Sequence, residues 1–291
     1  MWLSSVCMGD FNLVKKLREQ TGVGILACQK ALKDANDNYD EALDLLRKQG
    51  IAKAVSKADR VTSEGLCCLA HDDKFVVVIK LCCETDFVSK NEKFQEIINK
   101  IANIALKTRS RTLDELMKQS VDGVSVNDLI VSSIASIGEN IVLSDVVAYD
   151  VNDDERAVFY IHNKVNDNCG SIICFTISKG CDDSADLLLK QINMHIAAMS
   201  PVALNDNQIP EDILVKERAI YEEQVASLNK PSEIAKKMVD GKMRKFFEEN
   251  VLLRQTFVID NKNSIADVIA DFNKENGKNL TLVGFKRVSI K

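Results

Sequence analysis

Apolar residues within residues 10–50 recur every three or four positions, which is the spacing of one face of a helix. Polar or glycine-containing breaks at 21–24 and 36–38 divide this region into three short predicted helices. Asp10 is the expected N-cap of the first helix, and the third is expected to end before Gly50. Three helices in roughly 40 residues form a module near the lower size limit of independent stability.

The pattern changes to strands after a charged linker. Residues 64–70 and 75–81 are apolar runs with many β-branched side chains, and the polar residues 71–74 between them predict a β-hairpin. A long amphipathic helix is predicted next, over 91–107. A further helix is expected after Ser125, which has an acidic residue three positions on and can cap it.

A second block has the same order of elements. Strands are predicted at 141–149, 157–162 and 171–177, and a helix follows over 183–199. Hairpin, polar connection and long helix therefore occur at 64–107 and again at 156–199. This repetition predicts two related α+β subdomains.

The remaining residues predict a helical hairpin and a closing strand. Residues 211–249 contain two charged helices around a turn at 229–231, and their apolar stripe is narrow, so we expect an antiparallel hairpin that projects from the body. Residues 264–276 predict a helix. Residues 280–290 predict a strand that returns to the second sheet.

The fold class predicted from these patterns is α+β, with antiparallel sheets. The expected parts are an N-terminal extension at 1–9, a three-helix module at 10–50, a linker at 51–62, a first core subdomain at 63–148, and a second at 149–291 that contains the helical hairpin. Either Met1 or Met8 can be the initiator.

Composition and charge narrow the functional classes. The chain has 291 residues, 46% of them hydrophobic and 28% charged, as in globular proteins with full cores. Its 38 basic and 43 acidic residues give a net charge of −5, which disfavours direct binding to nucleic acid. No run of 18 apolar residues and no signal-peptide pattern occurs, so no membrane contact and a cytoplasmic location are expected.

The cysteines do not suggest a disulfide framework or a metal site. There are nine, two pairs are adjacent, and no CxxC motif occurs. Most lie in apolar runs, so we expect small buried hydrophobic side chains. A thiol enzyme is disfavoured, because no cysteine has a histidine or basic activator nearby in the sequence.

The histidines and glycines offer little catalytic chemistry. His71 and His162 fall at predicted turns or strand ends and are expected at the surface. His195 falls on the helix at 183–199 beside its apolar stripe, where it is either structural or a contact residue. Neither a phosphate-binding GxxxxGK[ST] motif nor a GxGxxG motif after a strand is present, so no nucleotide, cofactor or metal is expected in the chain.

One segment is unusual, because a large aromatic residue lies in a polar connection between strand and helix. Phe87, within residues 84–91, has two interpretations. Phe87 or Val88 can staple the entry of the following helix. Alternatively, Phe87 is an exposed anchor beside Asp86 that fits a partner's pocket.

Several motifs occur together in one order along the chain: Leu13-Val14-Lys15 with Thr21-Gly22-Val23-Gly24 and Lys30-Ala31-Leu32; Thr85-Asp86-Phe87-Val88 with Asn91 and Phe94; Ile137-Gly138-Glu139-Asn140; Met194-His195; and Lys230-Pro231 with Lys237-Met238-Val239. Their order and spacing resemble the translation elongation factor Ts family, over about residues 10–290. The resemblance implies a ubiquitin-associated-like three-helix module, a two-part core and a hairpin insertion.

The resemblance also implies a function and its residues. Members of that family are guanine-nucleotide exchange factors that bind elongation factor Tu and release GDP and magnesium, with no covalent chemistry. By this resemblance the partner-binding residues are Asp86, Phe87, Val88, Ile137, Gly138 and His195. A His195→Ala variant is then expected to lose some exchange activity with little change in melting temperature. The assembly is open between a homodimer and a heterotetramer with elongation factor Tu.

Two points leave alternatives. The family commonly has a lysine where this chain has Gln29, so a basic contact expected there is missing, and Lys30 points elsewhere on the helix. A different class of function is a non-catalytic adaptor, whose three-helix module binds ubiquitin-like or other helical partners.

Overall fold

The computed structural model describes residues 11–21, 23–121, 123–228 and 231–291. The predicted cap Asp10, both candidate initiators, and Asn229 and Lys230 of the predicted turn lie outside the described residues. The chain divides into two compact units. The first extends to Asp150 and also includes 163–171 and 288–291, and the second comprises 151–162 and 172–287.

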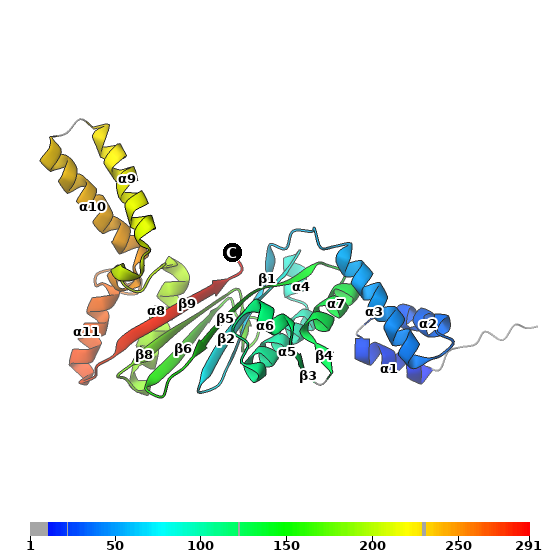
Figure 1. The fold of residues 1–291 in the computed structure, drawn as a ribbon. Coiled ribbons are helices and arrows are strands. Elements are labelled where there is room, and N and C mark those ends of the chain that lie inside the picture. The colour runs from blue at the N-terminus through cyan, green and yellow to red at the C-terminus, as the bar shows by residue number, and fades with distance from the viewer. Residues whose placement is uncertain (1–10, 22, 122, 229–230) are drawn as a thin grey trace, which may run out of the picture. The chain divides into compact units, whose positions relative to one another are not determined.

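The first unit begins with the predicted three-helix module. Its helices are α1 (Phe11–Thr21), α2 (Ile25–Asp34) and α3 (Tyr39–Val55) (Figure 1). The Asn38 side chain accepts hydrogen bonds from two backbone amides of the first turn of α3, which fixes where that helix begins. The module has its own buried cluster, formed by Val14, Leu17, Val23, Cys28, Ala31, Leu32, Ala35, Ala42 and Leu46.

The prediction that the third helix ends before Gly50 is wrong, since α3 continues to Val55. Gly50 is buried inside the helix, and a β-carbon placed on it would lie 3.3 Å from Val131 Cγ1 and 3.7 Å from Ala135 Cβ. The glycine therefore allows α3 to pack closely against α7 (Val126–Ile137), and it does not end the helix. Five residues of the predicted linker are helical.

An antiparallel sheet with helices packed on it forms the rest of the first unit. The sheet has the order β5-β2-β1-β7, with β1 at Glu64–His71, β2 at Phe75–Cys83, β5 at Ile141–Asp150 and β7 at Cys169–Gly170. The remaining elements are α4 (Asp86–Ser89), α5 (Glu92–Thr108), α6 (Leu113–Met117), and the short strands β3 (Ser120–Val121) and β4 (Val124–Ser125) before α7. The predicted hairpin, the long helix and the Ser125 cap are confirmed.

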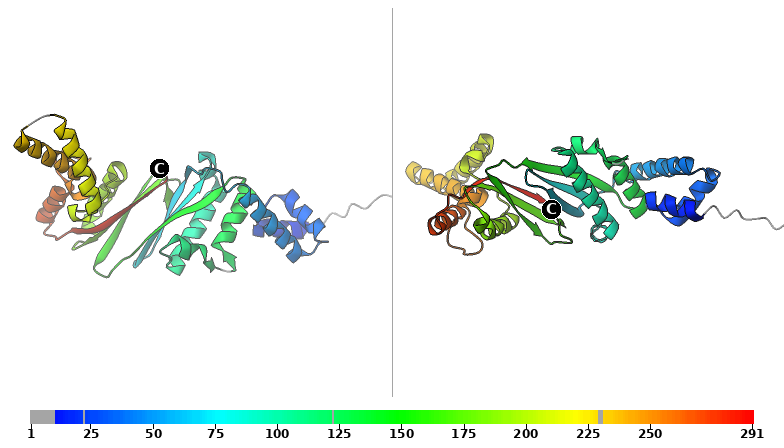
Figure 2. Two further views of the ribbon diagram at one scale, coloured as in Figure 1. Left: turned by 45° about the horizontal axis from the view of Figure 1, so that its top comes forward. Right: turned by 90° about the horizontal axis from the view of Figure 1, so that it is seen from below.

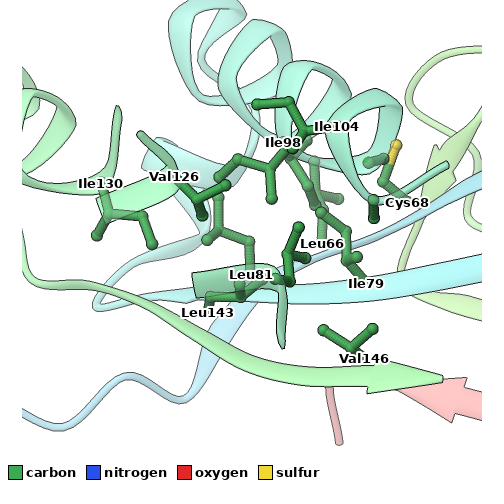
Figure 3. Packing of buried hydrophobic residues seen from close by; sticks show 14 of the residues in the cluster. Leu66, Cys68, Ile79, Leu81, Ile98, Ile104, Val126, Ile130, Leu143 and Val146 are labelled. Carbon is green, nitrogen blue, oxygen red and sulfur yellow. The ribbon is translucent and has the colours of Figure 1, made fainter. Parts of the chain in front are cut away.

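Helix α5 lies across β1 and β2, and the core fills the space between them (Figure 1). Figure 3 shows part of this cluster, in which Leu66, Ile79 and Leu81 from the strands face Ile98 and Ile104 from the helix. Val126 and Ile130 extend the cluster to α7. The amphipathic stripe of α5 therefore has the burial that its three-and-four spacing predicts.

Strand β7 is absent from the sequence prediction, which placed no strand between residues 162 and 171. It has two residues, too few for an alternating pattern to be visible. Asn166 determines the local shape, because its side-chain oxygen accepts hydrogen bonds from the amides of Asn168 and Cys169, each at 3.0 Å. These bonds turn the chain so that Cys169 and Gly170 pair with β1.

The second unit is also α+β. Its sheet has the order β6-β8-β9, with β6 at Glu155–His162, β8 at Ile172–Lys179 and β9 at Thr281–Ser289, which confirms the predicted return of the last strand. Helix α8 (Asp186–Met199) packs on β6 and β8, and α11 (Ile265–Asn276) begins at the capping box of Ser264. Three 3-10 turns, η1 (Asp183–Ala185), η2 (Asp206–Gln208) and η3 (Leu252–Arg254), complete the unit. The predicted α+β class with antiparallel sheets is confirmed.

Helices α9 (Glu211–Ala226) and α10 (Ser232–Asn250) form the helical hairpin and lie side by side in both views of Figure 2. Only Val225, Val239 and Met243 are buried within the described part of the two helices. The base of the hairpin, where α9 begins and α10 ends, is packed against the rest of the second unit. There the side chains of Leu214, Phe246 and Phe247 contact a small cluster formed by Ala203, Ile209 and Val251. The base thus belongs to the body of the second unit.

Removing only the outer part of the hairpin is expected to leave the second unit folded. Arg218 and Asp240 form an ion pair across the hairpin at 3.3 Å, so a short glycine linker can replace residues 219–239 between them. We expect one cooperative unfolding transition with an unchanged urea midpoint. The measurement is circular dichroism at increasing urea concentration. Deleting 212–249 instead removes Phe246 and Phe247 from the base, and this control should lower the midpoint. Loss of cooperativity in the shorter deletion would contradict the expectation.

Candidate partner-binding site

The connection between β2 and α5 holds the exposed aromatic residue. Thr85 has extended backbone angles and precedes the single helical turn α4, after which Asn91 caps α5. Phe87, the second residue of α4, is 81% exposed. Val88 is half-buried and packs against the first-unit core, and Ser89 is buried with its hydroxyl donating to the Asp86 carbonyl at 2.8 Å.

Helical geometry separates the two apolar side chains of this turn. Successive residues in a helix point about 100° apart, so a one-turn helix lying on the core can bury one of them and expose the other. Val88 is the residue that packs on the core, and Phe87 faces solvent. Of the two roles that the sequence left open, packing against the core therefore belongs to Val88 and exposure to Phe87.

Glu139 fixes the start of this turn. Its Oε2 accepts hydrogen bonds from the backbone amides of Glu84 at 3.1 Å and Thr85 at 3.0 Å, and its Oε1 accepts from the Thr85 hydroxyl at 2.7 Å. A carboxylate that accepts three such bonds holds the backbone firmly, because bonds to an ionised acceptor are stronger than neutral ones. The segment 137–140 and the segment 84–88 therefore form one structural site.

A second set of bonds ties the residues after α3 to the same site. The Asn140 amide nitrogen donates to Glu84 Oε1 at 2.7 Å, and its side-chain amide donates to the carbonyls of Ala58 and Arg60. Arg60 Nη1 lies 3.4 Å from both carboxylate oxygens of Glu84. The Asn140 amide, and secondarily Arg60, lower the pKa of Glu84, so this carboxylate is ionised at neutral pH.

Ile137 and Gly138 end α7 beside this network. Gly138 is the C-cap of the helix, with φ at +91°, a left-handed conformation that glycine adopts without strain. It is exposed, and its carbonyl accepts a hydrogen bond from the Lys57 ammonium group. Ile137 is half-buried. The sequence-predicted residues of both motifs are thus brought together in the first unit.

Asp86 is exposed next to Phe87 and carries a negative charge. Its carboxylate accepts a hydrogen bond from the Lys90 ammonium group at 2.7 Å, and this bond lowers the pKa of Asp86. The pair is open to solvent on both sides, so Lys90 can be displaced by a competing cation at small cost. The site can therefore offer a ring and a carboxylate to a partner.

If the chain has the nucleotide-exchange activity that the family resemblance implies, Glu139→Gln is expected to lower it about tenfold, a ratio that corresponds to about 1.4 kcal/mol. The amide oxygen can take the place of Oε2 and accept from both backbone amides, but a neutral acceptor binds them more weakly than a carboxylate. The NH2 group cannot accept from the Thr85 hydroxyl, so Phe87 is held less firmly. The measurement is GDP release at equal concentrations of folded protein. Exposed Glu96 on α5 supplies the charge control, and equal effects of Glu139→Gln and Glu96→Gln would refute a specific role.

His195 is buried, which favours the structural role that its helix position left open over the partner contact that the family resemblance implies. It is 0% exposed, and its ring lies 6.0 Å from that of Phe257. Nδ1 accepts a hydrogen bond from the Val258 amide at 3.3 Å, so Nε2 carries the proton and donates to Gln255 Oε1 at 2.8 Å. The exposed fraction leaves no surface of this side chain for a partner.

Burial of His195 predicts a pH effect on stability. Desolvation lowers the pKa of this imidazole below its ordinary value of 6.5, and the bond to Gln255 offsets only part of that. The unfolded state then binds the proton more readily than the folded state, so the free energy of unfolding falls as pH drops below about 6.5. Urea unfolding from pH 8 to pH 5 should show this loss. His195→Gln should have a shallower dependence, and an identical slope would contradict the prediction.

Other candidate groups take no part in this site. His71 and His162 are exposed, as predicted. Among the described cysteines, Cys181 is half-buried and the others are buried, which confirms the prediction for those residues, and burial raises the pKa of Cys67, Cys83 and Cys174 to about 12. Cys7 lies outside the described residues. Gln29 and Lys30 are both exposed on α2.

Within the described ranges, no group of three or more His, Cys, Asp or Glu side chains is arranged to hold a metal ion. No helix in the part of the chain that the structure describes is both long and apolar enough to cross a membrane.

Sequence reasoning missed how Glu84, Glu139 and Asn140 are connected. Each is a polar residue at the end of a helix or strand, where polar residues are usual, so no pattern distinguishes them. Their roles depend on bonds between positions about 55 residues apart. The motifs at 85–88 and 137–140 were recognised, but pairing between them was not predicted.

An exposed ring and carboxylate on one turn of an α+β protein form a candidate protein-binding surface. The family model described as Elongation factor TS matches residues 84–291, beginning at this site. The chain is 38% identical to Elongation factor Ts of Ehrlichia canis over 95% of this chain and 97% of the relative. It is 40% identical to that of the Wolbachia of Culex pipiens over 94% and 98%, and 38% identical to that of Rickettsia africae over 97% and 93%. The chain belongs to the elongation factor Ts family.

Proposed function

We propose that this protein is a guanine-nucleotide exchange factor for elongation factor Tu, acting in the cytoplasm during translation elongation. The observation that carries the proposal is Phe87, an aromatic side chain 81% exposed on a turn that Glu139 fixes with three hydrogen bonds. An exposed ring on a rigid support has the properties of an interface anchor, because little conformational entropy is lost when it is buried.

The proposed mechanism is displacement without covalent chemistry. Phe87 enters the GTPase domain of elongation factor Tu beside its magnesium site, and Asp86 and Val88 accompany it. Ile137 and Gly138, held against the same turn, contact the same domain. An apolar ring in that position displaces groups that hold the ion, and loss of the metal removes the main countercharge of the GDP diphosphate.

Thermodynamic linkage sets what the contacts must achieve. If the factor weakens GDP binding to its partner, GDP weakens binding of the factor by the same ratio. The contacts at Phe87 must therefore favour the nucleotide-free partner over the GDP-bound one. A difference of about 4 kcal/mol weakens GDP binding roughly a thousandfold.

The test follows fluorescent GDP as it leaves elongation factor Tu in an excess of unlabelled GDP. We expect the full chain to accelerate release, and excess GDP to dissociate the complex of the two proteins. The second measurement, by gel filtration, follows from linkage and also gives the stoichiometry, which decides between a homodimer and a heterotetramer. A complex that is insensitive to GDP would contradict the proposal.

The three-helix module favours a second candidate, a non-catalytic adaptor. Leu26 on α2 is 82% exposed and Phe11 on α1 is 72% exposed, so the module has an apolar surface of its own. The same experiment separates the two functions. An adaptor binds elongation factor Tu or another helical partner and leaves the rate of GDP release unchanged.

A further inference from the structure

Two buried cysteines face each other across the edge of the first-unit sheet. Cys68 on β1 and Cys169 on β7 are direct partners in the antiparallel register, both are free thiols, and their Sγ atoms lie 2.6 Å apart. Cys68 is at the edge of the core cluster in Figure 3. Neither cysteine belongs to the site around Phe87.

The register gives this pair the right backbone separation for a disulfide. The amide of Leu69 donates to the carbonyl of Asn168, directly opposite, at 2.9 Å. Hydrogen-bonded and non-hydrogen-bonded pairs alternate along antiparallel strands, so Cys68 and Cys169 form a non-hydrogen-bonded pair. The α-carbons of such pairs are about 4.5 Å apart, which lies within the range of about 4.4–6.8 Å found for disulfides.

The backbone on the Cys169 side is already fixed. Asn166 accepts hydrogen bonds from the amides of Asn168 and Cys169, and the amide of Val165 donates to the carbonyl of Cys169 at 2.9 Å. Forming a bond between the sulfurs therefore requires little additional ordering of the chain.

The surroundings of the pair provide a nucleophile and, beside the neighbouring residues Leu69 and Asn168, a small polar pocket. The hydrogen-bonding contact between the two sulfurs lowers the pKa of Cys169, while this contact and burial raise the pKa of Cys68. A polar pocket of about 140 Å³ is lined by Leu69, Asn99 and Asn168 among others, and Asn99 Oδ1 lies 3.4 Å from Cys68 Sγ. A molecule of water takes about 30 Å³ in the liquid, so the pocket can admit a peroxide.

We propose that Cys68 and Cys169 are a redox modification site, which hydrogen peroxide converts into a cross-strand disulfide. The Cys169 thiolate attacks one peroxide oxygen, the O–O bond breaks, and the departing hydroxide takes up a proton to become water, leaving a sulfenic acid. The sulfur of Cys68 then attacks the sulfenic sulfur, its proton joins the departing hydroxide as a second water, and the S–S bond forms. Two thiols and one peroxide give one disulfide and two waters.

The neighbouring Cys67 provides the contrast. Its side chain points to the other face of the sheet, it is paired in register with Lys80 on β2, and its Sγ lies 3.8 Å from the Ser171 carbonyl. Burial raises its pKa to about 12, so it is protonated at neutral pH. Of these adjacent cysteines only Cys68 is paired with another cysteine, whereas Cys67 is opposite Lys80 and Gly170, so the proposal is specific to Cys68.

The test is peptide mapping of the folded, full-length chain after treatment with hydrogen peroxide and alkylation of the remaining thiols. Trypsin releases Cys68 in residues 61–74 and Cys169 in residues 165–179, each with one other cysteine. A Cys67→Ala/Cys174→Ala variant leaves a single cysteine in each peptide. We expect the two peptides to be linked with a loss of about 2 Da and to separate after dithiothreitol. Fragmentation of the linked wild-type peptides should place the bond at Cys68 and Cys169.

A second measurement and a control complete the test. The bond would join residues 101 positions apart, so the oxidised chain should unfold at higher urea concentration than the reduced chain. In Cys68→Ala the link should vanish, and Cys169 should gain about 32 Da as a sulfinic acid at the same peroxide dose. Unlinked peptides in the wild-type chain, or equal linkage in Cys68→Ala, would overturn the proposal.

Discussion

Phe87→Ala is expected to lower exchange activity about thirtyfold while leaving the free protein as stable as the wild type. The ring is 81% exposed, so its removal should change the free energy of unfolding by no more than about 0.5 kcal/mol. If the ring is buried in a pocket of elongation factor Tu, its loss costs about 2 kcal/mol in the exchange-competent complex, which is roughly thirtyfold. The measurements are urea unfolding and GDP release on the same preparation.

Val88→Ala is the matched control, because it truncates the neighbouring apolar side chain of the same turn. Val88 is half-buried against the core, so this variant should lose about 1 kcal/mol or more of stability. The two variants then have opposite effects on the free protein. A destabilised Phe87→Ala with normal exchange per folded molecule would show that the ring supports the turn and would end the anchor hypothesis.

Most helices and strands could be predicted from the sequence, because the residue patterns that indicate them are local. The spacing of apolar residues in 92–108 and the cap at Ser125 each act within a few residues, and both were predicted. The end of α3 was not, because Gly50 is normally a poor helix residue and its close contact with Val131 involves a distant helix. Strand β7 was missed for the same reason. Its two residues are too few to show a strand pattern, and they are a strand only because they pair with β1, which is distant in the sequence.

For the candidate site, too, local motifs could be recognised in the sequence and contacts between distant residues could not. Resemblance identified Asp86, Phe87, Ile137 and Gly138, whereas the residue pattern alone left Phe87 open between a helix staple and an exposed anchor. The hydrogen bonds of Glu139 that bring the two motifs together depend on the folded chain and left no signal in either segment. Such bonds between distant positions require the three-dimensional structure.

His195 shows that the role of a helix residue cannot be assigned until the residues that pack against it are known. Counting from Leu188 and Ile192, position 195 continues the three-and-four spacing of the buried face. The sequence placed it beside the apolar stripe, so a structural role and a partner contact both stayed open. The contacts with Gln255 and Val258 favour the structural role, because both ring nitrogens are satisfied inside the protein.

His195→Ala is accordingly expected to lower the free energy of unfolding by about 3 kcal/mol. Truncation leaves a cavity beside Phe257 and removes the partner of Gln255 Oε1, and each effect costs on the order of 1–3 kcal/mol at a buried position. Exchange per folded molecule should stay near the wild-type value, since the imidazole has no exposed surface. Urea unfolding and GDP release again test both parts.

His195→Gln, which keeps a donor and most of the volume, should recover part of the lost stability. Wild-type stability combined with weakened exchange in His195→Ala would instead assign the histidine to the partner interface, and a rearrangement that exposes it would then be required.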